Sequence, residues 1–429
     1  MLGRQHARAV PPAVAAALLT AAGSGCGPGL EKLAAEGTGD LSYSLERRVA
    51  PDAGLVEACG DGEIRDDERL LRRPYLQRVD GSGASIVFTA PPGAAINVVL
   101  TLPDGSPVAS TEAAMDVHIG SGEVQYEARF ESLTPASIYC YELEGIAERA
   151  GFVTAPPAPA FAPRGAGDGR IAPDDEGAVR FIVFGDSGSG SAKQYALAEQ
   201  MATVPFDLIL HTGDIAYDDG TQRELDAHYF DVYAPLLRSF PAFPVTGNHD
   251  YRTEDAAPYR RSFVLPPNGG EAGRERWFSF DWGPVHFVAL DTEKTGATQA
   301  AWLERDLREN QLPWVIVYAH RPPYTSGRHG PDADMREVIV PILRRHRVEL
   351  VLTGHDHHYQ RFGPIDGITY VVTGGGGGPL RRVQPDWLTA YAETVFHFVH
   401  VEVGSDELLL HAIDGVGREF DSARVERRD

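Results

Sequence analysis

The chain has 429 residues, with 39 Lys and Arg against 61 Asp and Glu, and its formal net charge is −22. This length predicts two or three domains, and 43% apolar with 23% charged residues is typical of a globular protein. No apolar run reaches the roughly 18 residues that span a bilayer, which disfavours an integral membrane protein. The acidic excess disfavours nucleic acid as a main partner and is most simply a soluble acidic surface.

The first 25 residues predict an export signal. Arg4 and Arg8 precede an uncharged apolar run over residues 14–22, and small residues then lead to Cys26. This order is that of a secretory signal and is too short for a membrane helix. Cys26 resembles the lipidated cysteine of bacterial lipoprotein signals, although the usual Leu three residues earlier is missing. We expect export to the periplasm, the cell surface or the medium, with or without a lipid anchor at Cys26.

The next stretch predicts a tether followed by a small β domain. Residues 26–71 are rich in Gly, Asp and Glu with little periodicity, whereas residues 72–154 hold short alternating strands between turn signals. The predicted strands are 84–90, 96–102, 124–130 and 138–143. A stretch of about 80 residues with this pattern predicts a β-sandwich. Cys59 and Cys140 form an even pair of thiols, but the sequence leaves open whether they are joined.

A linker then leads into a second, larger domain. Residues 155–177 contain several prolines among Gly and Ala and predict a semi-extended linker. Strands and helices alternate over residues 178–415, and residues 416–429 are assigned to a C-terminal tail. The predicted strands are 179–184, 206–210, 242–246, 286–290, 314–318 and 349–352, and the predicted helices are 191–201, 222–237, 298–309 and 334–346. This alternation predicts an α/β domain with helices outside the sheets.

Five polar clusters follow five of these strands. They are Gly185-Asp186-Ser187-Gly188, Gly213-Asp214-Ile215-Ala216-Tyr217, Gly247-Asn248-His249-Asp250, Val317-Tyr318-Ala319-His320 and Gly354-His355-Asp356-His357. Ligands of α/β folds gather beyond the carboxyl ends of the strands. The clusters supply carboxylates, imidazoles, a carboxamide and a phenol but no thiolate, which suits one or two ions such as iron, zinc or manganese.

Each cluster alone has an ordinary structural interpretation. An Asp after a Gly is usually a turn or a helix cap, and a His on a strand is usually a core residue with its hydrogen bonds satisfied. Five such clusters, each at the end of a different strand, make coincidence a poor explanation. The sequence therefore predicts a metal centre at the edge of the sheet.

In this order, the five clusters resemble the purple acid phosphatases of the calcineurin-like metallophosphoesterase superfamily. The preceding β domain is similar to the fibronectin-like (fibronectin type III-like) domain of the plant-type members. Gly188 stands where most members of the wider superfamily have a His, and Tyr217 supplies a phenol that most of them lack. The resemblance implies an α/β (α+β) sandwich of two mixed β-sheets flanked by helices, preceded by a small all-β sandwich.

The resemblance also implies a set of metal ligands. It assigns Asp186, Tyr217 and His357 to Fe(III), and Asn248, His320 and His355 to a divalent ion (Fe, Zn or Mn), with Asp214 bridging the two. Phenolate and carboxylate suit a hard trivalent ion, whereas a carboxamide and imidazoles suit a divalent one. Tyr217 could instead merely pack beside the site. A metal-activated hydroxide would attack the phosphate, and the divalent ion would neutralise developing charge.

Two further histidines are candidates for catalysis. His249 directly follows a ligand and would face the phosphate as a hydrogen-bond donor or as the acid for the leaving group. His329 lies in a loop where the family places another substrate-side histidine, and a solvated loop histidine is the alternative. Asp250 is expected to orient a histidine or to cap a turn. Residues 374–378 are five glycines, which we interpret as a close-approach loop beside the metals rather than a nucleotide loop.

Taken together, these patterns predict an exported acid phosphatase that hydrolyses small phosphate monoesters. A phosphodiesterase with the same centre is one alternative. A non-catalytic surface protein, binding through the β-sandwich, is another, but a purely structural site would not need an open position for a substrate. No partner protein is indicated by the sequence.

Overall fold

The computed structural model of the chain describes residues 52–120, 122–158 and 178–428. The predicted leader, Cys26 and most of the predicted linker lie outside these residues. Within the described residues, none of the helices has both the length and the apolar character needed to cross a membrane.

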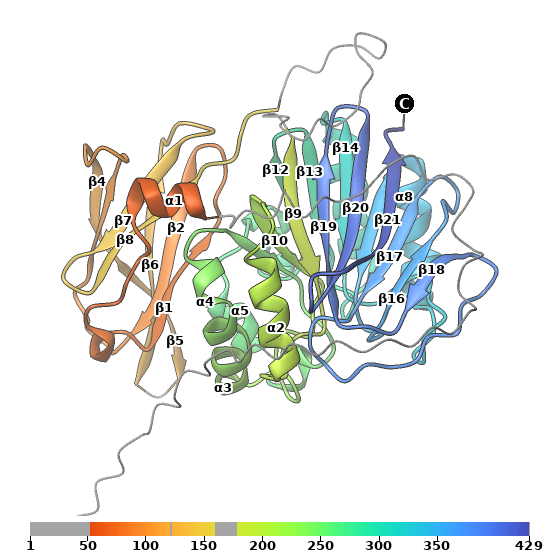
Figure 1. The fold of residues 1–429 in the computed structure, drawn as a ribbon, viewed down its shortest axis with the longest axis horizontal. Helices are drawn as coiled ribbons and strands as arrows, with labels where there is room; N and C mark the ends of the chain where they lie inside the picture. Colours follow the sequence, from red (N-terminus) through yellow and green to blue (C-terminus); the bar gives the residue numbers. More distant parts are fainter. Residues whose placement is uncertain (1–51, 121, 159–177, 429) are drawn as a thin grey trace, which may run out of the picture. The chain divides into compact units, whose positions relative to one another are not determined.

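The N-terminal part consists of two four-stranded antiparallel sheets, with strand orders β1-β2-β6-β5 and β4-β3-β7-β8 (Figure 1). The strands are β1 (Arg72–Gln77), β2 (Gly83–Ala90), β3 (Asn97–Thr101), β4 (Pro107–Glu112), β5 (Ala114–Gly120), β6 (Glu123–Glu131), β7 (Ile138–Leu143) and β8 (Ala147–Val153). All four strands predicted from alternation are present. The sequence analysis did not identify β1, β4, β5 and β8. In β4 nearly all side chains are exposed, so that no alternation marks it. The likeness to a fibronectin domain stays a prediction.

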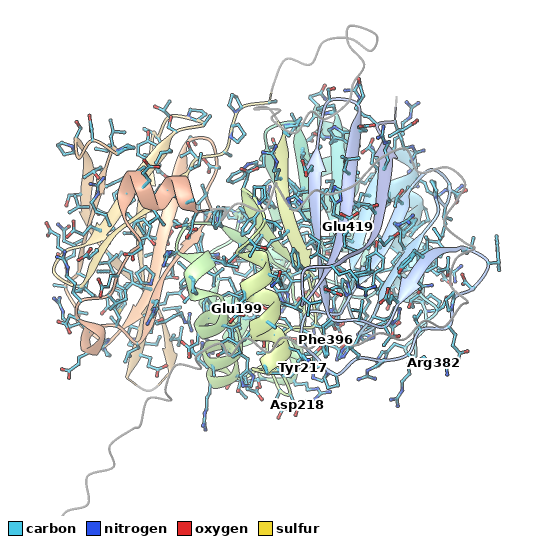
Figure 2. The ribbon with its side chains drawn as sticks, viewed as in Figure 1. Glu199, Tyr217, Asp218, Arg382, Phe396 and Glu419 are labelled. Atoms are coloured by element: carbon cyan, nitrogen blue, oxygen red, sulfur yellow. A yellow bond between two sulfur atoms is a disulfide. The ribbon has the colours of Figure 1, made fainter. Side chains whose placement is uncertain are left out.

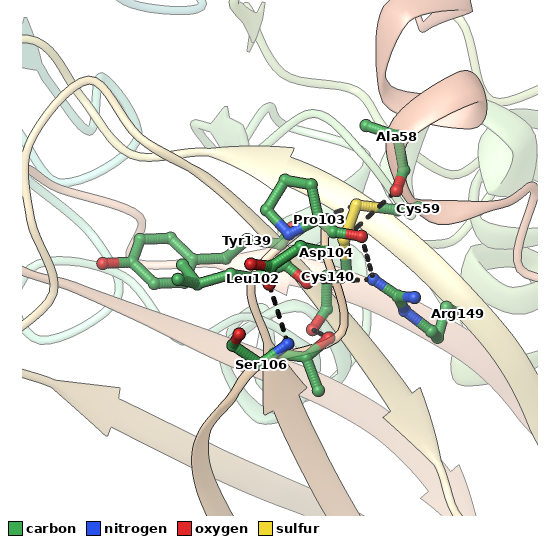
Figure 3. Close-up of a disulfide and its surroundings, with 10 residues drawn as sticks. Ala58, Cys59, Leu102, Pro103, Asp104, Ser106, Tyr139, Cys140 and Arg149 are labelled. Atoms are coloured by element: carbon green, nitrogen blue, oxygen red, sulfur yellow. Dashed lines mark hydrogen bonds between the residues drawn. A yellow bond between two sulfur atoms is a disulfide. The ribbon is translucent and has the colours of Figure 1, made fainter.

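A short helix lies within the range predicted to be a tether. Helix α1 (Ala53–Cys59) buries Leu55 and Cys59, and a disulfide joins Cys59 to Cys140 of β7 (Figure 3). The prediction of a tether over residues 26–71 therefore needs correction at its end. A helix of two turns is too short to show the periodicity from which longer helices are recognised.

The C-terminal part contains two larger sheets, with strand orders β11-β10-β9-β19-β20-β21 and β12-β13-β14-β15-β17-β16-β18. The first comprises β9 (Val179–Phe184), β10 (Leu208–His211), β11 (Ala242–Pro244), β19 (His397–Val403), β20 (Glu407–Asp414) and β21 (Glu419–Glu426). The second comprises β12 (Phe278–Trp282), β13 (Val285–Ala289), β14 (Trp314–Tyr318), β15 (Leu350–Thr353), β16 (Tyr359–Phe362), β17 (Thr369–Thr373) and β18 (Thr389–Glu393). Both sheets are mixed: β9, β10 and β11 run parallel, as do β13, β14, β15 and β17, while the remaining pairs are antiparallel.

Helices lie between successive strands of the C-terminal part. They are α2 (Ala192–Met201), α3 (Gln222–Leu225), α4 (Asp231–Leu237), α5 (Ala257–Ser262), α6 (Gly270–Gly273), α7 (Ala297–Glu309) and α8 (Val340–Arg345). Ser191 is the N-cap of helix α2: its side chain accepts the Gln194 backbone N–H and so satisfies one of the free donors of the first turn. Helices α7 and α8 contribute Trp302 and Leu343 to an apolar cluster with Val317 and Val351 of the seven-stranded sheet. The predicted α/β fold of two mixed sheets with flanking helices is confirmed.

The six-stranded sheet extends beyond the predicted end of the domain. Residues 416–429 were expected to be a tail, but β21 pairs with β20 from Glu407 opposite Glu426 to Ile413 opposite Glu419. The side chains of β21 are half-buried or exposed apart from Val425. An edge strand of this kind carries too little hydrophobic alternation for its sequence to be recognised.

Candidate metal centre

All five polar clusters lie at the carboxyl ends of parallel strands, where the two large sheets meet. Asp186 follows β9, Asp214 follows β10, and both have left-handed backbone conformations, with φ of 56° and 53°. The backbones are packed so closely that a Cβ atom on Gly247 would lie 2.2 Å from Asp214 Oδ1. Glycine is therefore required at this position, because the loop after β11 passes directly over the carboxylate.

The hydroxyl of Tyr217 is the centre of one group of side chains. It lies 3.2 Å from Asp186 Oδ1, 3.1 Å from Asp214 Oδ2 and 3.1 Å from His357 Nε2. Figure 2 labels Tyr217 and Asp218 in the loop that follows β10. Burial, followed by the charges of Asp186 and Asp214, raises the pKa of Tyr217 well above its usual value. Without a cation, this group therefore opposes a phenolate.

His320 is the centre of the second group. Its Nε2 lies 3.1 Å from His355 Nδ1, 3.3 Å from Asn248 Oδ1 and 3.5 Å from Asp214 Oδ1. Burial lowers the pKa of His320, but the carboxylates of Asp214 and Asp186 outweigh it and raise the pKa above its usual value. The surroundings of this nitrogen thus favour a positive charge.

Backbone carbonyls fix the tautomers of two of these imidazoles. His320 Nδ1 lies 2.8 Å from the Thr212 carbonyl oxygen, and His357 Nδ1 lies 2.8 Å from that of Pro379. A carbonyl oxygen can only accept, so each Nδ1 carries a hydrogen and donates it. The unprotonated Nε2 of each neutral ring then faces the carboxylates, which is the arrangement that metal-binding histidines adopt.

Asp214 belongs to both groups. Its Oδ2 contacts the Tyr217 hydroxyl and its Oδ1 faces His320, and ligand atoms of Asp186, Asp214 and His320 all lie within 4.8 Å of one another. The structure therefore brings together all seven side chains predicted as ligands. They form two groups of oxygen and nitrogen acceptors that share one carboxylate, and this donor set fits two cations.

The structure also explains why the first cluster carries Gly188. A Cβ atom at this position would lie 1.9 Å from the Ile215 carbonyl oxygen, so a histidine has no space there. Instead, the Gly188 carbonyl accepts the backbone N–H of Tyr217 at 2.7 Å. The absence of a histidine at position 188 and the placement of Tyr217 thus both depend on the close packing of Gly188 against residues 215–217.

His249 and His329 lie at opposite ends of the two groups. The His249 ring packs edge-on against Tyr217 with centroids 4.5 Å apart, and its Nδ1 lies 2.6 Å from the Asp218 carbonyl oxygen. The His329 ring lies 4.3 Å from that of His355. Both histidines keep some exposure, unlike most of the predicted ligands. A molecule bound between them would contact the exposed face of the centre.

Three charged residues at the site escaped the sequence analysis or were given another role. Arg321 approaches His355 Nε2 at 3.2 Å, and Arg252 approaches His249 Nε2 at 3.3 Å. Asp250 accepts the backbone N–H groups of residues 215, 216 and 247 at 2.8 to 3.3 Å. Asp250 therefore joins two loops of the centre rather than orienting a histidine. The sequence marks these three residues only by their position, because each lies within four residues of a predicted ligand.

The five-glycine loop passes against the first aspartate. The backbone N–H of Gly378 donates to the Asp186 carbonyl oxygen at 2.7 Å. A Cβ atom on Gly374 would lie 2.7 Å from Asp186 Oδ2. This confirms the interpretation of residues 374–378 as a close-approach loop beside the centre.

Comparison with known proteins agrees with this geometry. Residues 179–359 match the calcineurin-like phosphoesterase family model. "Purple acid phosphatase 3" of Arabidopsis thaliana is 27% identical over 56% of this chain and 76% of its own length. Human "Tartrate-resistant acid phosphatase type 5" is 26% identical over 58% of this chain and 92% of its own.

A solved structure shows the same fold. The purple acid phosphatase PPD1 of yellow lupin superposes with a TM-score of 0.68 at 20% identity, covering 82% of this chain and 74% of its own. Residues 179–359 therefore form the calcineurin-like phosphoesterase domain of a metal-dependent phosphoesterase that is related to the purple acid phosphatases.

Proposed function

We propose that the chain is an exported acid phosphatase that holds two metal ions and hydrolyses phosphate monoesters. One observation carries the proposal: the Tyr217 hydroxyl touches Asp186, Asp214 and His357, while Asp214 also reaches the group around His320. A single phenolic proton cannot satisfy three acceptors. A cation could satisfy all of them at once.

The donor chemistry supports two different ions. Asp186, Tyr217 and His357 would hold Fe(III), because phenolate and carboxylate oxygens stabilise a hard trivalent ion. Asn248, His320 and His355 would hold a divalent ion, for which we propose Fe, Zn or Mn. Asp214 would bridge the two, since its two oxygens already face different groups. When bound, the ions would make water acidic enough to act as the nucleophile and would screen the phosphate charge.

The chain's own groups would bind and orient the ester. His249 is held by the Asp218 carbonyl through Nδ1–H, which turns Nε2 toward the centre, 4.0 Å from Asp214 Oδ2. From there it would donate a hydrogen bond to the phosphate or a proton to the leaving group. His329, packed on the ring of His355, would contact the ester from the other end of the site.

Two features support export. The charged and then apolar leader ends in small residues before Cys26, as in secretory signals. Cys59 and Cys140 form a disulfide, and disulfides form and persist mainly in oxidising compartments such as the periplasm or the exterior of the cell. We propose that the leader is removed and that Cys26 is the candidate site for a lipid.

The test is hydrolysis by the purified, metal-loaded protein. Turnover of an aryl phosphate monoester at acidic pH, much faster than turnover of the matching diester, supports the proposal. Faster turnover of the diester would favour the phosphodiesterase alternative. No hydrolysis of either ester by a protein carrying two ions would contradict an enzymatic function.

A further inference from the structure

The loop over residues 325–329 forms one wall of the metal centre. It carries His329, whose ring lies 4.3 Å from that of His355 and is tilted by 42° to it. The ring of His329 is exposed, so packing against the protein interior does not fix its position. Its placement therefore depends on the backbone of its own loop as well as on the contact with the His355 ring.

The buried carboxylate of Asp356 holds this backbone at both ends. Asp356 Oδ2 accepts the hydroxyl of Thr325 at 2.6 Å, and Oδ1 accepts the backbone N–H of His329 at 3.2 Å. Thr325 Oγ1 in turn accepts the backbone N–H of Gly327 at 2.9 Å. A Cβ atom on Gly327 would lie 2.3 Å from the same carboxylate, so the middle of the loop also presses directly on it.

The energetics make this attachment strong. Asp356 is 0% exposed, and a buried carboxylate is costly unless donors satisfy its oxygens. Hydrogen bonds to a charged group contribute more than neutral ones, and removing a partner leaves the charge unsatisfied. Each oxygen of Asp356 accepts a hydrogen bond from the loop. Moving the loop away would break both hydrogen bonds and leave the carboxylate without these donors.

A second contact fixes the loop to the same segment of chain. The Gln360 side chain accepts the backbone N–H of Ser326 at 2.9 Å and donates to Ser326 Oγ at 2.9 Å. Asp356 and Gln360 belong to the segment that also carries His355 and His357. The loop is thus tied to the predicted metal ligands rather than to a distant part of the fold.

We propose that Asp356 is a positioning residue that fixes His329 against His355, so that His329 meets the ester bound at the centre. This rests on the proposed function, and it decides between the two interpretations of His329. His329 is then not a solvated loop residue, and Asp356 is more than a spacer between two ligands.

The test perturbs the attachment at Thr325, which is not itself a predicted ligand, and compares it with His329→Ala. Thr325→Val removes the hydroxyl that Asp356 accepts, whereas Thr325→Ser retains it. Thr353→Val is the matched control, because Thr353 is also buried and donates its hydroxyl to the Val371 carbonyl oxygen at 3.2 Å. Metal content is measured for every variant.

We expect Thr325→Val to lower kcat by about 10- to 100-fold, because misplacement by about 1 Å can cost that much. Metal content should be unchanged, and Thr325→Ser and Thr353→Val should stay within about threefold of wild type. In the His329→Ala background, Thr325→Val should have little further effect on kcat. A full additional loss in that background, or an equal loss in Thr353→Val, would overturn the proposal.

A binding measurement separates this inference from the proposed function. Calorimetric titration of the metal-loaded wild type and variants with inorganic phosphate measures their phosphate affinities. These affinities form the same double-mutant cycle of Thr325→Val and His329→Ala, and the measurement needs no turnover. A wild type that binds phosphate without hydrolysing esters would refute the phosphatase proposal, while the cycle would still decide the role of Asp356. If Thr325→Val does not fold, Asp356→Asn replaces it in both cycles, with the same expected non-additivity.

Discussion

Removing the Cys59–Cys140 disulfide should detach helix α1 and destabilise the N-terminal β domain. Helix α1 is only seven residues long and buries two side chains, and an isolated helix of this length is not stable in water. The disulfide joins residues 81 apart, for which the chain-entropy model gives about 4.5 kcal/mol, within an observed range of about 2–5 kcal/mol. We expect the free energy of unfolding of this domain to fall by about 3 kcal/mol.

Urea unfolding, followed by fluorescence, measures this loss in three samples: oxidised wild type, reduced wild type, and the Cys59→Ala/Cys140→Ala variant. Reductant should lower the midpoint of the wild type to that of the variant and leave the variant unchanged. Hydrolysis in the absence of urea should survive, because the disulfide joins α1 to β7 and neither belongs to the metal centre. Equal midpoints in oxidised and reduced wild type would refute the reasoning.

Three further predictions concern the centre and the core. Asp214→Ala should lose both metals and activity, whereas His249→Ala should keep the metals and lose about 10²- to 10⁴-fold in turnover; metal analysis and kinetics check this. Gly188→Ala should displace Tyr217, because its Cβ would lie 1.9 Å from the Ile215 carbonyl oxygen; lost iron with retained folding, measured by metal analysis and circular dichroism, is the expected result. Burial raises the pKa of Glu349 from 4.5 to about 7. Between these two pH values the folded state keeps a proton that the unfolded state releases. The free energy of unfolding therefore falls by about 3 kcal/mol as the pH rises from the lower value to the higher. Glu349→Gln should flatten that slope in unfolding experiments from pH 4 to pH 8, and an unchanged slope would contradict it.

The convergence of the polar clusters could be predicted because each follows a buried strand and most begin with a glycine, whereas the ligand set is implied by the family resemblance and stays a prediction. Asp186 and Asp214 come directly after Gly185 and Gly213, and the structure places both in left-handed conformations at the sheet edge. Parallel strands bring their carboxyl ends together, so residues distant in sequence converge without any signal for the individual contacts. The prediction therefore used the position of each cluster at the end of a strand and not its distance along the chain.

The supporting contacts could not be predicted, because they use backbone atoms. The carbonyls that fix His320 and His357 belong to Thr212 and Pro379, 108 and 22 residues away, and any residue type could supply a carbonyl oxygen. Nothing in the sequence marks a role for Asp356, since its partners lie in another loop. Strands with little buried apolar surface, such as β4 and β21, were not predicted for a different reason. Strands are recognised in a sequence by hydrophobic alternation, which these two lack.

The visible absorption spectrum of the protein, purified aerobically with iron, tests the two-metal centre most directly. Fe(III) bound to the Tyr217 phenolate would absorb visible light, because charge moves from the electron-rich ring to the metal. The proposal predicts a broad visible band in the wild type and its loss in Tyr217→Phe, which keeps the ring that packs on His249. An iron-loaded wild type without such a band, or a Tyr217→Phe variant that retains it, would contradict the assignment of Tyr217 and of the centre built around it.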